Sequence, residues 1–319
     1  MPTIIPSFGR WERLADTEKF FSNQPHAFVR QASPSFFAEA DDNEDVDLCA
    51  IYEQVAAKVW DSLNQNPRGF CVGFGNTKIA TLTIAMMVAG QEATWPGYDV
   101  AVEPVYGGMR FEIGAKMYGS DLNRGGDGGV GSWAAEWLLK YGILFKTVYK
   151  SYDFRQYSES RCSDMGRNGV PDELEPIAKE KPLTEASLCS DGSDCWRLLG
   201  GLHPLVHCSN QGFAMRRNGD GTCKATGSWA HCAGWTGRFT LRGGTRVLRY
   251  DNSWDGDGQG NGYLGEPITI DGANGPIHLN GNQFLVPLDV VDRMCRSGKE
   301  TYAFLGVKGL TNRRALFLN

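Results

Sequence analysis

Apolar residues recur at helical spacing in two segments of the first half of the chain. The segment CAIYEQVAAKVW, residues 49–60, has helical periodicity, and CVGFGNTKIATLTIAMMVAG, residues 71–90, is apolar over a length that suits a buried helix. The second segment begins just after Pro67 and Gly69, residues typical of a turn. Cys71 is therefore expected near the N-terminus of a buried helix.

A third helix is predicted after a glycine-rich turn in GGDGGVGSWAAEWLLKYGI, with Gly142 as its stop. After about residue 200 the pattern changes to short strands separated by turns, including RVLRYDNSW, NQFLVPL and ETYAFLGVKGL. Helices thus precede strands. This order predicts an α+β fold with a helical lobe followed by a sheet lobe.

The chain divides by pattern into an arm and a large domain. Residues 1–45 mix proline, aromatic and acidic residues and are predicted to form an N-terminal arm or linker, whose partner stays open. Residues 46–319 are predicted to form one domain, with a helical lobe at about 46–165 and a β lobe at about 200–319. The polar stretch at about 155–200 is expected to be a loop-like insertion.

Composition narrows the class of protein. The 319 residues are 41% hydrophobic and 22% charged, and the net charge of -5 includes no basic run, so neither nucleic acid nor an anionic membrane is an expected partner. The N-terminus lacks the pattern of a signal peptide, which predicts a protein that is cytoplasmic or virion-associated rather than exported. Its nine cysteines are accordingly expected to be reduced.

The string NQNPRGFCVGFGN surrounds the first candidate for catalysis. A cysteine attacks a carbonyl carbon as the thiolate, which a helix N-terminus stabilises. Gln65 lies six positions before Cys71, and its amide could share an oxyanion hole with the backbone N–H of Cys71. Taken alone, Cys71 is better explained as a small core residue than as a catalyst. The whole string, however, resembles the nucleophile segment of the papain family of cysteine peptidases.

This sequence departs from that family's pattern around the cysteine. Arg68 stands where the family usually has a half-cystine and Gly126 where its partner is expected, so the resemblance implies that this disulfide is missing. Val72 replaces the usual tryptophan and Gly73 the usual alanine. The absence of a signal peptide and of this disulfide resembles bacterial or phage members of the family.

Two further strings resemble the same family in the same order. Gly128 and Gly129 match the glycines that edge the substrate cleft and offer backbone hydrogen bonds to an extended peptide. The string GSWAHCAGWTGRFTLRGGTRVLRYDNSWDGDGQGNGYLGE resembles the family's histidine strand, asparagine motif and closing turn. By this resemblance His231 is the general base, Asn252 orients its ring, and Trp254 covers the bond between them.

Two departures lie beside these residues. Asp255 follows the NSW string where the family has glycine, and Ala230 precedes the histidine where asparagine or aspartate is frequent. The separations from Cys71 to His231 and Asn252 exceed the family's usual spacing, which places the insertion at about 155–200.

The resemblance implies a papain-like two-lobe fold: an N-terminal helical lobe and a C-terminal antiparallel β-sheet or barrel lobe, with the active-site cleft between them. It implies a cysteine-type endopeptidase that cleaves polypeptides through a thioester on Cys71, without a cofactor. Members of the family commonly carry an inhibitory N-terminal propeptide, so the arm could cover the cleft, dock a protein partner or pad the fold. The main alternative is a weak or inactive papain-like structural protein of a virion or large assembly. A cell-wall amidase is disfavoured, because that class generally lacks the NSW string.

Metal binding is not expected. His203 and His207 are four residues apart, but Pro204 favours an extended strand over the helix that would bring the two rings together. Cys189 and Cys195 flank a short acidic loop without the spacing of a zinc site. The calcium-like string DNSWDGDGQGNG lacks the terminal glutamate that such a loop needs, which leaves it as a turn.

Overall fold

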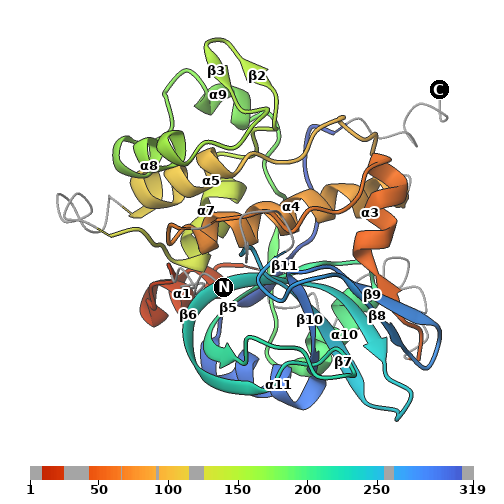
Figure 1. Ribbon diagram of the computed structural model, residues 1–319. Coiled ribbons are helices and arrows are strands. Elements are labelled where there is room, and N and C mark those ends of the chain that lie inside the picture. The colour runs from red at the N-terminus through yellow and green to blue at the C-terminus, as the bar shows by residue number, and fades with distance from the viewer. Residues whose placement is uncertain are drawn as a thin grey trace.

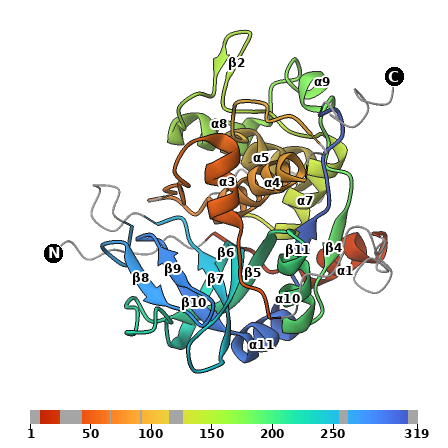
Figure 2. The ribbon, with the colours of Figure 1, turned by 90° about the vertical axis from the view of Figure 1, so that its right-hand side faces the viewer.

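A computed structural model describes residues 9–24, 43–65, 67–90, 93–114, 126–254 and 262–310. Helices gather on one side of the molecule and a large sheet on the other, as Figure 1 shows from the front and Figure 2 after a quarter turn. The helices on the first side are α3 (Leu48–Ala56), α4 (Cys71–Ala89), α5 (Val102–Gly108), η1 (Met109–Gly114), α7 (Gly131–Lys140), α8 (Glu159–Asn168) and α9 (Glu175–Ala178). The predicted α+β organisation is confirmed.

The core of the helical side is α4. Almost its whole length is buried because nearly every position is apolar or small, and it packs against α3, α5, α7 and the sheet strand β6. Of the helices in the described part of the chain, it alone is long and apolar enough to span a membrane, with a mean hydropathy of 1.3. Since 89% of that window is buried inside the protein, α4 has the environment of a core helix.

The sheet is antiparallel and has the order β10-β7-β6-β5-β11-β4, with β1 paired to β6. Its strands are β1 (Val46–Asp47), β4 (Ala186–Leu188), β5 (Leu205–Phe213), β6 (Ala225–Thr240), β7 (Arg246–Asp251), β10 (Gln283–Pro287) and β11 (Thr301–Phe304). Helices α10 (Gly192–Gly200) and α11 (Leu288–Gly298) pack on each other and on the sheet. Two small hairpins form separate two-stranded sheets: β2 (Val148–Tyr149) pairs with β3 (Tyr152–Asp153), and β8 (Ile268–Asp271) pairs with β9 (Pro276–Leu279).

The prediction that the stretch at about 155–200 is loop-like is wrong, because this stretch contains α8, α9, β4 and α10. Helix α8 is capped at its N-terminus by Ser158, whose hydroxyl accepts the Arg161 N–H, and it buries Cys162, Met165 and Gly166. These three residues share one helical face. Because this face is short and weakly apolar and the residues around it are polar, the sequence pattern does not predict the helix.

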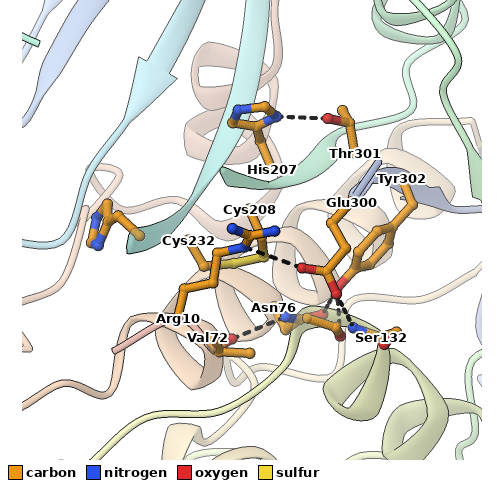
Figure 3. The surroundings of a disulfide bond; sticks show 12 residues. Arg10, Val72, Asn76, Ser132, His207, Cys208, Cys232, Glu300, Thr301 and Tyr302 are labelled. Atoms are coloured by element: carbon orange, nitrogen blue, oxygen red, sulfur yellow. Dashed lines mark hydrogen bonds and ion pairs between the residues drawn. A yellow bond between two sulfur atoms is a disulfide. The ribbon is translucent and has the colours of Figure 1, made fainter. Parts of the chain in front are cut away.

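The expectation that every cysteine is reduced is also wrong. Cys208 in β5 and Cys232 in β6 lie directly opposite each other and form a disulfide, which Figure 3 shows beside the start of α4. The bond is tightly enclosed. A side chain at Gly75 would meet the Cys232 sulfur at 3.0 Å, and one at Gly131 would meet the Cys208 sulfur at 2.8 Å. The other seven cysteines are free and buried.

A short N-terminal helix, α1 (Leu14–Ser22), packs against α7. The residues before it, 9–11, run as an extended segment into the middle of the molecule, where Arg10 forms a bridge with Gly129. Residues 9–11 are called the arm segment below. They come from near the N-terminus of the sequence and lie beside Gly129, from the middle of it.

Candidate active site

Cys71 is the first residue of α4 and is fully buried. Burial raises the pKa of the Cys71 thiol to about 12, because a thiolate loses its hydration there; hydrogen bonds from the backbone N–H groups of Cys232, Gly9 and Val72 act in the opposite direction. The helix N-terminus also favours the anion. In this closed arrangement burial prevails, and Cys71 is a protonated thiol at neutral pH.

His231 in β6 and Asn252 just after β7 are hydrogen-bonded. The distance from His231 Nε2 to Asn252 Oδ1 is 2.6 Å, and the same oxygen accepts the Ser253 N–H at 2.8 Å. Because that oxygen can only accept, His231 Nε2 carries the hydrogen, and the neutral ring presents Nδ1 as its acceptor. Nδ1 is buried and has no hydrogen-bond partner among the described residues.

Electrostatics keep the imidazole neutral. Burial lowers the pKa of His231 to about 3, the Asn252 hydrogen bond opposes this shift, and the positive charge of Lys78 adds to it. The Cys71 thiol lies within hydrogen-bonding reach of the backbone N–H of Cys232, the residue after His231. The fold thus places a cysteine thiol beside the strand that carries a neutral histidine with a bare Nδ1.

Gln65 and Trp254 lie around this pair. The Gln65 N–H donates to Ser253 O at 2.9 Å, and its side-chain amide donates to Arg68 O at 3.2 Å in the turn before Cys71. The centroid of the Trp254 ring is 4.5 Å from that of His231 at an interplanar angle of 39°, and Trp254 is buried. Trp254 therefore lies against the imidazole of His231.

The arm segment pairs with the second of the two predicted glycines. Gly129 N–H donates to Gly9 O at 2.8 Å, and Trp11 N–H donates to Gly129 O at 2.7 Å. Arg10 N–H donates to Ala230 O at 3.0 Å, directly before His231. The polar backbone groups of Gly128 are taken up inside the helical lobe, by the Tyr106 hydroxyl and the Arg110 guanidinium.

The arm segment closely contacts the turn that precedes Cys71. A Cβ at Gly9 would lie 1.8 Å from the carbonyl oxygen of Gly69, so only glycine fits at this point. The Gly9 N–H also lies within hydrogen-bonding reach of the Cys71 thiol. The arm segment therefore covers Cys71 and occupies the backbone groups of Gly129.

A buried ion pair that the sequence did not reveal anchors the arm segment. Arg10 Nε donates to Glu300 Oε2 at 3.2 Å (Figure 3). Its Nη1 donates to Asn210 Oδ1 at 2.8 Å. The side chains of Arg10 and Glu300 are 2% and 1% exposed. These residues are 290 positions apart, and nothing in the local pattern around either points to the other.

A second buried ion pair, which the sequence also did not reveal, holds the backbone at Asn252. Lys78 in α4 donates to Asp251 Oδ1 at 2.7 Å and to the backbone oxygens of Asp251 and Asn252 at 2.8 and 2.9 Å. Asp251 also accepts from Trp60 Nε1 and Gln283 Nε2, each at 2.7 Å. The helix that begins with Cys71 thus holds the end of β7, from which Asn252 projects.

One departure from the family pattern, the missing disulfide before Cys71, coincides with another contact between the same segments. Arg68, at the expected half-cystine position, forms ion pairs with Glu159 at 2.7 Å and with Asp127 at 3.8 Å. Asp127 adjoins Gly126, where the other half-cystine is expected, so an exposed ion pair joins the segments that a disulfide would link. Asp255 and most of the calcium-like string lie outside the described residues.

No family model and no curated protein matches this sequence. Solved structures do resemble it. Xylellain, a cysteine protease from Xylella fastidiosa, has a TM-score of 0.57 at 13% identity, covering 95% of this chain and 99% of that one. ProCathepsin B S9 from Trypanosoma congolense has a TM-score of 0.55 at 13% identity, covering 95% of this chain and 86% of that one. The chain has the papain-like two-lobe fold that its motifs predict.

Proposed function

We propose that this protein is a cysteine peptidase held latent by its arm segment. The observation that carries the proposal is the His231–Asn252 hydrogen bond at 2.6 Å, because it leaves Nδ1 as the free acceptor of the buried His231 ring. The backbone N–H of the next residue, Cys232, lies within hydrogen-bonding reach of the Cys71 thiol. A neutral histidine with a bare nitrogen is the form that accepts a proton from a nucleophile. The structural neighbours named above are cysteine peptidases, which supports the same reading.

The chemistry follows from these positions. His231 Nδ1 takes the proton of the Cys71 thiol as sulfur attacks the peptide carbonyl carbon, and the oxyanion that forms is stabilised by the Cys71 backbone N–H and the Gln65 amide. The carbon–nitrogen bond then breaks, and the amine leaves with the proton from Nδ1. Water, deprotonated by His231, attacks the thioester, releases the carboxylic acid and restores the thiol.

Latency is part of the proposal because the arm segment lies where an extended peptide would pair. Gly129 spends both backbone groups on Gly9 and Trp11, so a substrate needs the arm segment to move first. The covered, protonated Cys71 is also what an inactive structural protein of this fold would contain. An experiment that moves the arm without touching the site separates these two readings.

We would treat the full chain with a thiol-directed epoxide inhibitor and measure labelling of Cys71 by intact and peptide mass. Gly9→Ala is expected to displace the arm segment, because its Cβ would overlap Gly69 O. Gly243→Ala is the matched control, because a Cβ there meets nothing within 4 Å. The peptidase reading predicts faster labelling of Cys71 in Gly9→Ala by about tenfold or more, with Gly243→Ala like the parent.

Cys71→Ser and His231→Ala complete the set, each in the Gly9→Ala background. Labelling should vanish in the first and slow strongly in the second. Labelling of Cys71 at the rate of the other free cysteines in the Gly9→Ala protein would favour the structural reading instead.

A further inference from the structure

We infer that Glu300 and Asn210 form a binding site for the guanidinium of an arginine in the substrate, and that Arg10 is its occupant in the latent protein. These two acceptors and the space that the Arg10 side chain fills are called the guanidinium site. That the incoming arginine belongs to a substrate rests on the function proposed above. The site itself rests on the contacts described below.

The Glu300 carboxylate is held from the body of the protein. Its Oε1 accepts the Thr17 hydroxyl at 2.8 Å and the Ser132 N–H, in the first turn of α7, at 3.1 Å. Its Oε2 is left for Arg10 (Figure 3). The carboxyl is nearly inaccessible, and it immediately precedes the buried strand β11. The acid therefore has a fixed position set by two separate elements.

An unpaired carboxylate at this depth is costly. Removing one partner of a buried ion pair strongly destabilises a protein, since the remaining charge keeps its desolvation cost. A peptide that displaces the arm segment takes away Arg10 and leaves Glu300 in that state. A peptide that brings its own cation avoids the cost, whereas a neutral side chain does not.

The shape of the site favours arginine over lysine. Arg10 uses Nε for Glu300 and Nη1 for Asn210, two acceptors reached by different nitrogens of one planar group. A guanidinium has donors in such a fork, whereas the lysine ammonium is a single compact centre. The preference should therefore be strongest for arginine, weaker for lysine and weakest for citrulline, which keeps the shape of arginine without its charge.

The backbone fixes which residue of a peptide reaches the site. Arg10 is the residue that bridges Gly129, flanked by the hydrogen bonds of Gly9 and Trp11. Side chains of an extended strand alternate in direction, so one position of a bound peptide is directed at Glu300 while its neighbours are not. Selectivity for arginine should accordingly appear at a single position.

Binding, measured apart from catalysis, tests this inference. The protein is the full chain with Gly9→Ala, which displaces the arm segment, Arg10→Ala, which removes the occupant of the site, and Cys71→Ser, which prevents turnover. The probes are alanine hexapeptides that carry one arginine at successive positions, each beside the same peptide with citrulline, and Kd is measured by calorimetry. At one position arginine should bind about tenfold or more tighter than citrulline.

The same measurement with Glu300→Gln added should reduce that ratio to about threefold or less, while the binding of the citrulline peptides stays similar. Similar binding of those peptides also shows that the Glu300→Gln protein is folded. Equal affinity for arginine and citrulline at every position, or a preference that survives Glu300→Gln, would overturn the inference. Neither result depends on labelling of Cys71, so failure of the guanidinium site and failure of the peptidase proposal can be told apart.

Discussion

At the scale of single residues, burial determines the resting state of the site. The Cys71 thiol and the His231 imidazole both lose hydration in the closed protein, which raises the pKa of the first to about 12 and lowers that of the second to about 3. Both shifts favour the neutral forms over a thiolate–imidazolium pair. Displacing the arm segment would return water to the site, so uncovering Cys71 and activating it would be the same event.

The orienting hydrogen bond gives a prediction at this scale. In the Gly9→Ala background, Asn252→Ala should slow labelling of Cys71 by about 10- to 100-fold, because the ring loses the acceptor that keeps hydrogen on Nε2. Asn168→Ala, at an exposed position in α8, is the control and should label like its parent. Unchanged labelling in the Asn252 variant would count against the proposed part of Asn252 in catalysis.

At the scale of elements, α4 both supplies Cys71 and fixes the end of β7. Lys78 lies seven positions beyond Cys71 on the same helix, and its Nζ bonds three oxygens of residues 251 and 252. Burial lowers the pKa of Lys78, and Asp251 opposes the shift. The pair therefore joins the helical side to the sheet at the end of β7, next to Asn252.

Replacing Lys78 tests this connection. Lys78→Met should lower the free energy of unfolding by about 3–5 kcal/mol, since Asp251 is left as an uncompensated buried charge. Urea unfolding measures the loss, and adding Asp251→Asn should recover part of it. Lys140→Met, at an exposed lysine, should change stability by about 0.5 kcal/mol or less. A small effect of Lys78→Met would mean that the pair is not needed to hold the two elements together.

Features that depend on residues close together in the sequence could be predicted, whereas contacts between residues far apart in the sequence could not. Helix α4 and strand β7 follow from local periodicity. The string that begins GSWAHC contains both His231 and the NSW string with Asn252, and these two residues are hydrogen-bonded. The ion pairs of Arg10 with Glu300 and Lys78 with Asp251 join residues 290 and 173 positions apart. Such pairs depend on how elements pack in space, and the local pattern around either residue does not indicate its partner.

At the scale of the whole molecule, three buried histidines make stability depend on pH. Burial lowers the pKa of His203 to about 4 and that of His207 and His231 to about 3. The unfolded chain, where histidine has a pKa near 6.5, binds protons at pH values where the folded protein does not. The stability contributed by these neutral histidines is thus present above about pH 6.5 and is lost as the pH falls below it.

Lowering the pH from neutral to about 5.5 should cost about 1 kcal/mol of unfolding free energy for each of these histidines. Urea unfolding at the two pH values measures this difference. His207→Gln should reduce the pH dependence by about one histidine's share, whereas His278→Gln, at an exposed position, should leave it as it is in the parent. An equal pH dependence in the parent and in the His207 variant would show that His207 is not the source.

The disulfide between β5 and β6 has a consequence for how this sequence can change over evolutionary time. Its two sulfur atoms lie against Gly75 and Gly131, where any side chain would approach them to 3.0 Å or less. In a lineage that loses the cysteines, both glycines are released from that constraint, whereas in a lineage that keeps the bond they must stay small. Substitutions at positions 75, 131, 208 and 232 should therefore be correlated in descendants of this gene.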